Sequence, residues 1–364
     1  MRKGFLTFWL TVCLTGAISL TAPGQESAIA KPEDGDKRFR LVFYNLENAF
    51  DTIDDPYPGD DTFLPDGARG WTPYRYWTKI RGLYKVIVAT GGWELPDLIG
   101  VCEVEHHRVL KDLIHHTPLS KHPYRTLHKN SPDPRGMDVA AIYHPGRLEV
   151  ISHRYIPVRM EGGSLSTRDI LYIKGLIKRR DTLHVFFNHW PSKWQGALKT
   201  QAKRNRAAVI LKKHIDSIYC TEPDARIVAA GDFNDPPGAE CLTKHLNALK
   251  LEGTPDKERL YNLSFSWRSL PIGTQKYRAH WQLLDQIIVS GNLLLPGTKC
   301  NESYGKTQQG LYTSTSMARI FAPGFLLIED DHYPGIKPFR TYTGYKYSGG
   351  FSDHLPVILD LEMK

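Results

Sequence analysis

The chain alternates short apolar runs with longer amphipathic stretches over most of its length. Val, Ile, Phe and Tyr fill the short runs, and Gly, Pro, Asp or Asn bound them, which is typical of β-strands. Three longer stretches, residues 74–90, 105–116 and 199–217, place apolar side chains at helical spacing. Because both kinds of element alternate throughout, they predict one large α/β domain over residues 38–364. The expected strands are residues 40–44, 98–102, 139–143, 171–177, 183–188, 226–230, 284–289 and 355–361.

The first residues have the pattern of an export signal. Arg2 and Lys3 precede an uncharged, mostly apolar segment, residues 4–20, and small side chains follow. This pattern predicts a signal peptide over residues 1–24. An uncleaved anchor is the alternative, but the segment is near the lower length limit for a membrane span and contains Thr and Gly. Residues 25–37 are polar and charged and predict a disordered lead-in. We expect an exported protein, periplasmic or secreted, with no membrane span after cleavage.

Charge adds little to this picture. The formal net charge is +8, and it stays positive when the two basic residues of the signal peptide are removed. A mildly basic surface suits anionic substrates without identifying one. A solvated basic surface without a function is an equal alternative.

The five cysteines do not predict a metal site. Cys13 follows a valine where a lipoprotein signal would have a small residue, so lipid anchoring is not expected. Cys102 lies in an apolar run and is expected to be a buried thiol. The other three have polar surroundings, and one pair among Cys220, Cys241 and Cys300 could form a disulfide after export. The sequence has no CxxC and no close Cys/His set of the kind that binds zinc.

Polar residues gather where the expected strands begin or end. A strand bordered by acid, amide or imidazole side chains is how a rigid sheet presents catalytic groups at its rim. Each residue also has a structural interpretation, as a turn former, an ion-pair partner or a satisfied histidine. The candidates are Asn45, Glu47, Glu103, His189, Asp232, Asn234, Asp285, Asp353 and His354.

The run IVAAGDFND is the most specific of these signals. Asp232 could take a proton from water, while the amide of Asn234 could donate to a phosphate oxygen and hold the nucleophile in line. The small residues 229–231 are expected to leave room for a substrate. In the run FYNLEN, Asn45 and Glu47 are two residues apart, so on a strand their side chains point the same way and could hold a metal.

Three further candidates depend on their partners. Glu103 ends an apolar strand, and a buried carboxylate there needs a cation or a donor. His189 suits proton transfer near neutral pH, as an electrophile or general acid. Asp353 could bind metal while His354 acts as a base or stabilises charge, and Asp285 is well placed to orient that imidazole.

Together these segments closely resemble the endonuclease/exonuclease/phosphatase superfamily, which includes DNase I-like nucleases, abasic-site endonucleases, sphingomyelinases and inositol polyphosphate phosphatases. The matching blocks occur in the family's order between residues 44 and 357, and GDFND and SDHLP are the most specific. They are YNLEN, VCEVE, RGMDVA, NHWPSK, GDFND, LLDQIIVS and SDHLPV. The resemblance implies an α/β fold of four layers, an α/β/β/α sandwich of two mixed β-sheets, with the site at one rim.

The resemblance also implies a cofactor, Mg²⁺ or Mn²⁺, and a role for each residue. Hard oxygen ligands of this kind suit Mg²⁺. Glu103 would be the main metal ligand, helped by Glu47 and Asp353 and supported by Asn45. The implied catalytic residues are His189, Asp232, Asn234, Asp285 and His354. By the resemblance, Asp232 positions or deprotonates the attacking water, with Asn234 beside it. His354 pairs with Asp285 and contacts the scissile phosphate. His189 occupies the position that is His in the DNase and sphingomyelinase branches.

Cationic and aromatic residues are candidates for substrate binding. Arg135 and Lys193 could meet a phosphate, and Tyr277, Arg278 and Trp281 could stack a base or cradle a headgroup. The alternatives are ordinary ion pairs and core aromatics that cap the sheet. Two positions depart from the commoner family pattern: His106 stands where Asn is expected, and Lys193 stands where Arg is frequent. Arg168 and Arg206 are further cationic candidates.

These inferences predict a monomeric, metal-dependent hydrolase of phosphate esters. Its expected partner is a phosphate-ester substrate, with nucleic acid favoured by the basic charge. A lipid- or sugar-phosphate hydrolase on the same fold is the alternative, with residues 321–336 as a weak candidate for membrane contact. A non-catalytic binding protein is a remote alternative, because such a protein should have lost some of the catalytic residues and here all are present.

Overall fold

The structure is a computed structural model that describes Met1 and residues 37–55, 59–160, 167–193, 196–295 and 310–363. The predicted signal peptide and nearly all of the predicted lead-in lie outside the described residues, as does Cys300. The description below concerns the compact unit Asp34–Lys364. Among the described residues, no helix is long and apolar enough to cross a membrane.

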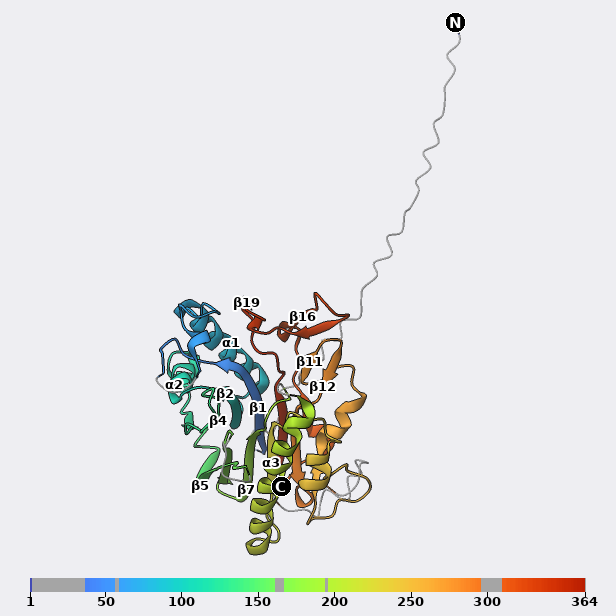
Figure 1. The fold of residues 1–364 in the computed structure, drawn as a ribbon. Coiled ribbons are helices and arrows are strands. Elements are labelled where there is room, and N and C mark those ends of the chain that lie inside the picture. The colour runs from blue at the N-terminus through green and yellow to red at the C-terminus, as the bar shows by residue number, and fades with distance from the viewer. Residues whose placement is uncertain (2–36, 56–58, 161–166, 194–195, 296–309, 364) are drawn as a thin grey trace. The chain divides into compact units, whose positions relative to one another are not determined.

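Two seven-stranded sheets form the centre of this unit (Figure 1). The first has the order β14-β20-β1-β2-β4-β3, with β15 also paired to β20. The second has the order β5-β6-β7-β8-β13-β10-β9. Both are mixed, because β1–β2, β7–β8 and β9–β10 pair in parallel and their other pairs are antiparallel. Their bounds are β1 Arg38–Ala49, β2 Leu98–Val104, β3 Arg125–Leu127, β4 Asp138–Tyr143, β5 Leu148–Ile156, β6 Ile170–Ile177, β7 Asp181–His189, β8 Ile227–Asp232, β9 Ala248–Leu249, β10 Leu260–Asn262, β13 Asp285–Ser290, β14 Leu311–Tyr312, β15 Ala318–Ile320 and β20 Val357–Met363.

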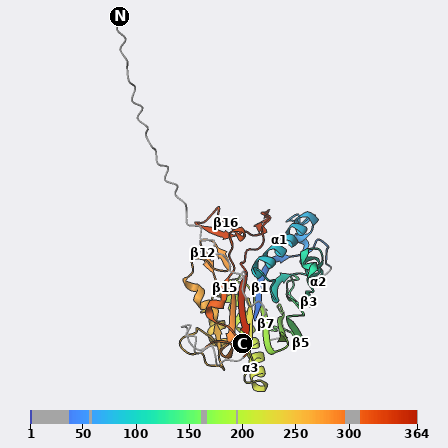
Figure 2. The same cartoon turned by 180° about the vertical axis from the view of Figure 1, so that it is seen from behind.

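Helices cover the outer face of each sheet (Figures 1 and 2). Helices α1 (Pro73–Gly91) and α2 (His107–His115) pack on the first sheet, and α3 (Ala197–Thr221) packs on the second. The result is the α/β/β/α sandwich that the family resemblance implied. Short helical segments lie between the strands: η1 Asp61–Phe63, η2 Pro118–Lys121, η3 Cys241–His245, η4 Leu263–Ser269, η5 Gly291–Leu293, η7 Thr315–Met317 and η8 Gly324–Leu326.

The alternation of side chains along β1 shows why the central strands are apolar throughout. Leu41 and Phe43 enter the core between the two sheets, whereas Val42 and Tyr44 enter the core beneath α1 and α2. A strand buried on both faces needs apolar side chains at every position. This burial explains why the sequence shows continuous runs here instead of a polar–apolar alternation.

Strand β5 was not predicted, although eight expected strands and three expected helices are present. It lies at the edge of the second sheet and pairs only with β6, and most of its side chains are exposed. Leu148, Val150 and Tyr155 pack against the core, but the register shift between Val150 and Ser152 breaks their alternation, so the sequence shows no regular strand pattern. Cys102 is buried, as expected. Cys241 is also buried, and its thiol donates to Asp235 Oδ2 at 3.4 Å. Cys220 is exposed, and these three thiols are free.

Three small hairpins extend the domain. They are β11–β12 (Gln275–Tyr277 and His280–Gln282), β16–β17 (Leu327–Glu329 and Ile336–Pro338) and β18–β19 (Tyr342–Thr343 and Lys346–Tyr347). An isolated bridge pairs Gln275 with His354, so β11–β12 begins beside one of the predicted catalytic residues.

Candidate functional site

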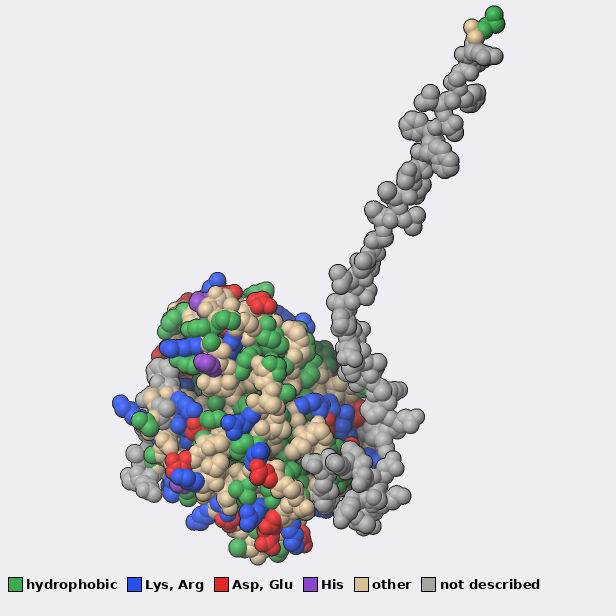
Figure 3. Space-filling model, turned by 90° about the vertical axis from the view of Figure 1, so that its right-hand side faces the viewer, with side chains coloured by type: hydrophobic (Ala, Val, Ile, Leu, Met, Phe, Trp, Pro, Cys, Tyr) green, Lys and Arg blue, Asp and Glu red, His purple; other side chains and the backbone are tan. Residues whose placement is uncertain are grey.

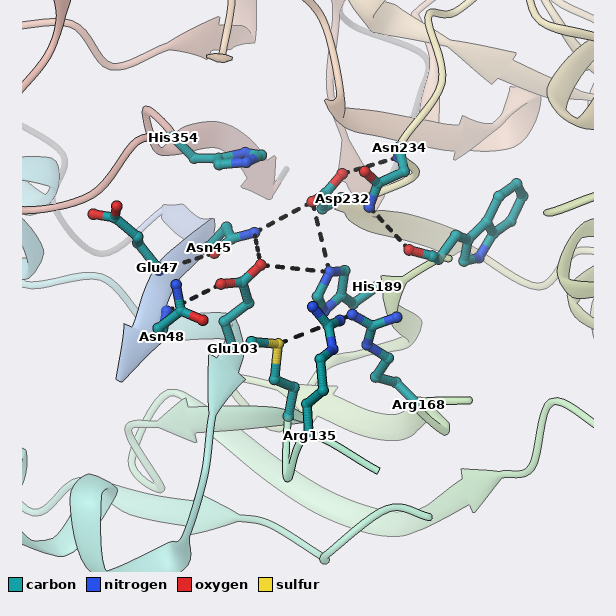
Figure 4. A network of polar contacts seen from close by, with 12 residues as sticks. Asn45, Glu47, Asn48, Glu103, Arg135, Arg168, His189, Asp232, Asn234 and His354 are labelled. Carbon is teal, nitrogen blue, oxygen red and sulfur yellow. Dashed lines mark hydrogen bonds and ion pairs between the residues drawn. The ribbon is translucent and has the colours of Figure 1, made fainter. Parts of the chain in front are cut away.

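The ends of four central strands, two from each sheet, bring acid, amide and imidazole groups together (Figure 4). The Asn45 amide donates to Glu103 Oε1 and to Asp232 Oδ2, each at 3.2 Å. His189 Nε2 lies 3.8 Å from both Glu103 Oε1 and Asp232 Oδ2. Because β1 and β2 belong to the first sheet and β7 and β8 to the second, the cluster joins the two sheets at one rim.

The backbone is irregular at this rim. Glu47, Asn48, Glu103 and Asn234 have positive φ angles of 49°, 52°, 59° and 54°, which is uncommon for residues other than glycine and clusters at functional sites. The pairing of β2 with β4 also shifts register around Glu103. One consequence is that the Asn48 N–H donates to Glu103 Oε2 at 3.0 Å, so the backbone itself holds the Glu103 carboxylate.

Asp232 and Asn234 are held by the turn that follows β8. The Asn234 N–H donates to Asp232 Oδ1 at 2.9 Å, and the Asn234 amide donates to the Trp190 carbonyl at 2.9 Å. The expected room for substrate at residues 229–231 is not seen. A Cβ on Gly231 would lie 2.3 Å from the Asn188 carbonyl oxygen, so the glycine is needed for close packing against β7.

Asp285 and His354 form a buried pair beside Asp232. His354 Nδ1 lies 2.6 Å from Asp285 Oδ2, and Asp285 stands opposite Asp232 in the register of β13 with β8. Asp232, Asp285 and His354 each offer a ligand atom within 4.8 Å of the others. Burial disfavours the imidazolium, but the charge and hydrogen bond of Asp285 outweigh it and raise the pKa of His354 well above its usual value.

The same burial gives Asp232 and His189 unusual proton affinities. Burial raises the pKa of the Asp232 carboxyl to about 7, with Asp285 adding to the effect and His354 opposing it. Burial, helped by the charges of Arg168 and Arg135, lowers the pKa of His189 well below its usual value. The site therefore holds a neutral imidazole at His189 and a protonated one at His354.

Glu47 and Asp353 lie to one side of this cluster, around an arginine that sequence reasoning missed. Arg340 Nη2 lies 2.9 Å from Glu47 Oε1 and 3.1 Å from Asp353 Oδ2, and the Thr341 N–H donates to Glu47 Oε2 at 2.7 Å. The positive φ of Glu47 interrupts the alternation of β1, so its carboxylate turns away from Glu103 (Figure 4). Arg340 lies in the run PFRTYTG, which carries no motif, so only the fold reveals it.

Arg135 and Arg168 both lie beside His189 (Figure 4) but differ in exposure. The Arg135 side chain is 49% exposed and can reach solvent, whereas Arg168 is buried and pairs with Asp133 at 3.2 Å. Lys193 is engaged in an ion pair with Asp235 at 2.6 Å. Arg206 is on α3, where it donates to the Arg159 carbonyl at 3.1 Å.

The predicted aromatic group occupies the β11–β12 hairpin. Tyr277 is 56% exposed, and the Arg278 guanidinium lies 5.4 Å from its ring centroid. Trp281 is half-buried and lines a cavity of about 360 Å³ together with Lys193. The two aromatics therefore differ. Tyr277 is exposed, as a substrate-stacking residue would be. Trp281 packs partly against the core, as an aromatic that caps the sheet would.

The donor set fits a hard divalent cation. Glu103 and Asp232 offer carboxylate oxygens, which are the ligands that Mg²⁺ and Mn²⁺ prefer. Asn45 positions both carboxylates through its Nδ2, because its Oδ1 accepts from the Glu47 N–H at 2.9 Å. Asp285 Oδ1 is buried without a hydrogen-bond partner among the described residues. Burying several carboxylates together costs free energy unless nearby positive charge compensates them. A bound cation would supply that positive charge.

Two facing mixed sheets with helices outside, and a carboxylate, amide and imidazole centre at one rim, define a four-layer sandwich of the DNase I-like class. The chain belongs to the Endonuclease/Exonuclease/phosphatase family, whose model matches residues 40–363. It is thus a member of a phosphoesterase family. A search of curated proteins finds no match.

Solved structures share this fold at low sequence identity. An endonuclease/exonuclease/phosphatase family protein from Bacteroides thetaiotaomicron has a TM-score of 0.52 and 12% identity, covering 90% of this chain and 98% of its own. Humanized D. rerio TDP2 has a TM-score of 0.53 and 11% identity, with 89% and 98% covered. The mannosyl-6-phosphatase of B. thetaiotaomicron has a TM-score of 0.53 and 14% identity, with 89% and 99% covered. At these identities the likeness concerns the fold alone.

Proposed function

We propose that this chain is an exported, divalent-metal-dependent phosphodiesterase that acts on nucleic acid. The observation that carries the proposal is the meeting of Asn45, Glu103, His189, Asp232 and the Asp285–His354 pair at one rim, drawn from both sheets. Membership of a phosphoesterase family supports the reaction class.

Glu103 would hold the cation, Mg²⁺ or Mn²⁺, and Asn45 would support it by positioning the Glu103 carboxylate. Glu47 and Asp353, which share Arg340, add negative charge beside them. When bound, such a cation supplies positive charge next to a non-bridging phosphate oxygen and the leaving oxygen. The remaining steps belong to side chains of this chain.

Asp232 takes the proton of the attacking water. With a pKa of about 7, its carboxyl is substantially ionised near neutral pH and well matched to general-base work. The Asn234 N–H fixes one of its oxygens, which leaves the other, Oδ2, facing Asn45 and His189. Water attacks phosphorus in line, the bond to the leaving oxygen breaks on the opposite side, and no covalent enzyme intermediate forms.

The two histidines stabilise the charge that builds on the phosphoryl oxygens. His354 is protonated and is oriented through Nδ1 by Asp285, so its Nε2 can donate to the phosphate. His189 is neutral and presents Nε2 toward the cluster. Preorganised donors of this kind lower the barrier because they need no rearrangement as charge develops.

Nucleic acid is the proposed substrate because cations and an exposed aromatic flank the site. Arg135 can contact a backbone phosphate. Tyr277 with Arg278 offers a stacking surface on the β11–β12 hairpin, which begins beside His354 at Gln275. Figure 3 shows basic side chains interspersed with acidic and apolar ones. On that face, the basic side chains do not form a continuous basic surface. The proposal of a nucleic-acid substrate therefore rests on the residues around the site.

A lipid-phosphate hydrolase is the second candidate, and one observation favours it. The region of residues 321–336 includes η8 and part of the β16–β17 hairpin, and it exposes three large apolar side chains: Phe325 (43%), Tyr333 (39%) and Ile336 (38%). Exposed apolar side chains on a hairpin can enter a membrane surface.

A hydrolysis panel separates these candidates. The substrates are plasmid DNA, RNA, sphingomyelin vesicles, inositol phosphates, a sugar phosphate and an aryl phosphodiester, each with Mg²⁺ or Mn²⁺ and with chelator. We expect cleavage of nucleic acid and of the aryl phosphodiester, abolished by chelator. Asp232→Asn and His354→Gln should each lower kcat by about a hundredfold or more, the scale of general acid–base catalysis.

Matched substitutions far from the site serve as controls. Asp216→Asn removes an exposed carboxylate of α3, and His153→Gln removes an exposed imidazole of β5; both should keep full activity. Undiminished hydrolysis in chelator would disprove the metal requirement. Cleavage of sphingomyelin alone would favour the second candidate over the first.

A further inference from the structure

An acidic loop follows β1 and lies apart from the proposed catalytic residues. Residues 51–61 contain five aspartates and no Lys or Arg, within a chain whose net charge is +8. Asp51 and Asp55 of this loop contact Glu105 and His106, the two residues that follow β2. These residues line a cavity of about 400 Å³ together with Asp55.

Three side chains converge at this place. Asp55, Glu105 and His106 each offer one ligand atom, and these atoms lie within 4.8 Å of one another. His106 Nε2 is 2.6 Å from Asp55 Oδ2. Glu105 Oε2 accepts from the Asp51 N–H at 2.8 Å, so one oxygen of Glu105 is anchored and the carboxylate is fixed in orientation.

The other oxygen of Glu105 lacks a partner. Glu105 is only 3% exposed, and its Oε1 is buried without a hydrogen bond among the described residues. Asp60, 2% exposed, shows the same feature: its Oδ2 accepts from the Asp55 N–H at 3.2 Å, while its Oδ1 has no partner. Buried carboxylate oxygens without partners are costly, and a bound cation would compensate them.

The two other acidic residues that line the cavity, Asp133 and Asp138, already have basic partners. Asp133 binds Arg168 at 3.2 Å, and Asp138 binds His128 at 2.8 Å. Arg108 lies 3.7 Å from Asp51 and is 55% exposed. None of these pairs involves Glu105, whose carboxyl has no ion-pair partner among the described residues and lies where Asp55 and His106 meet it.

We propose that Asp55, Glu105 and His106 form a second divalent-metal site, separate from the catalytic centre, for a transition-metal ion such as Mn²⁺ or Zn²⁺. Two carboxylates and an imidazole, with water completing the shell, are a ligand set of these ions, whereas Ca²⁺ and Mg²⁺ prefer oxygen ligands alone. The ion fastens the acidic loop to the end of β2, two residues after Glu103. The proposal does not require the chain to be a hydrolase.

Metal titration of the full mature chain tests this site. Mn²⁺ and Zn²⁺ binding is measured by calorimetry, and bound metal is counted after dialysis, for the wild type and for Glu105→Gln, Asp55→Asn, His106→Gln and Glu103→Gln. Asp66→Asn removes an exposed charge outside the groups of potential metal ligands found among the described residues and serves as the control. We expect Glu105→Gln, Asp55→Asn and His106→Gln each to remove the same bound ion, while Glu103→Gln and Asp66→Asn retain it.

Two results would overturn the proposal. One is a wild type whose bound metal disappears only with Glu103→Gln, which would leave the catalytic centre as the sole site. The other is Ca²⁺ binding here as tightly as Mn²⁺ or Zn²⁺, which would remove the imidazole from the ligand set. Glu105→Gln keeps the shape of the side chain and an oxygen for the Asp51 N–H, and the other two variants test the same ion independently if that variant fails to fold.

Discussion

At the scale of single residues, the site contains two histidines whose environments separate their protonation states. Asp285 keeps His354 protonated through a 2.6 Å contact with Nδ1. His189 has no carboxylate at hydrogen-bond distance, and burial keeps it neutral. Sequence alone could nominate both imidazoles as catalytic, but their opposite charge states depend on neighbours that come from other strands.

Asp285→Asn tests the orienting role of this carboxylate. Without it, His354 loses the group that fixes its ring and its proton. We expect kcat to fall by about 10- to 100-fold, the usual effect of losing such a supporting carboxylate, with little change in KM. Steady-state kinetics on the aryl phosphodiester measures both constants.

Asp224→Asn is the control for that substitution, because this carboxylate is 80% exposed. It should leave both constants unchanged. An Asp285→Asn variant with an unaltered kcat would show that His354 needs no partner. A fall in thermal stability matching the loss of activity would instead point to a purely structural role.

At the scale of secondary-structure elements, a buried lysine connects α1 to the rim. Lys79 Nζ donates to the Glu47 carbonyl at 3.2 Å and to Thr341 Oγ1 at 2.6 Å, and it also donates to the Phe351 carbonyl. Burial lowers its pKa to about 8. Three segments distant in sequence thus depend on one ammonium group. The sequence predicts an amphipathic helix here but not this bridging role of Lys79.

Lys79→Met should therefore destabilise the domain. The methionine fills a similar volume but leaves the three acceptors without their donor, and each unsatisfied buried group costs about 1–3 kcal/mol. We expect the free energy of unfolding, measured with urea, to fall by at least about 2 kcal/mol.

Lys85 offers a matched comparison, since it is on the same helix but is exposed. Lys85→Met should change the unfolding free energy by less than about 0.5 kcal/mol. Equal effects of the two substitutions would contradict the bridging role of Lys79.

At the scale of the whole molecule, the two sheets pack closely where a glycine of one sheet meets an aromatic ring of the other. An added Cβ on Gly100 of β2 would lie 2.2 Å from ring atoms of Phe187 on β7. Phe187 in turn stacks on Phe43 of β1, with ring centroids 6.2 Å apart. The spacing of the sheets, and so the meeting of their catalytic residues at the rim, depends on this contact.

Gly100→Ala should overpack the core between the sheets. We expect a loss of about 1–3 kcal/mol in the free energy of unfolding, measured by denaturant titration. The double variant Gly100→Ala with Phe187→Leu should be more stable than the sum of the single effects predicts, because the smaller side chain makes room for the new methyl group.

Gly324→Ala is the control, because an added Cβ there meets no atom within 4 Å. It should be close to neutral. Strict additivity of the Gly100 and Phe187 substitutions would show that the two residues do not limit the spacing of the sheets.

The sequence by itself determined the central strands, the three helices, the α/β class and most of the residues at the rim. Short continuous apolar runs that are rich in β-branched and aromatic residues and bounded by turn formers indicate buried strands, and the polar residues that border them then lie at a sheet edge. Only the tertiary structure decided that Glu47 turns to Arg340, that Gly231 serves strand packing, and that the loop of residues 51–61 meets Glu105. These features depend on positive-φ residues and on contacts between segments far apart in the chain, and neither leaves a periodic signal in the sequence.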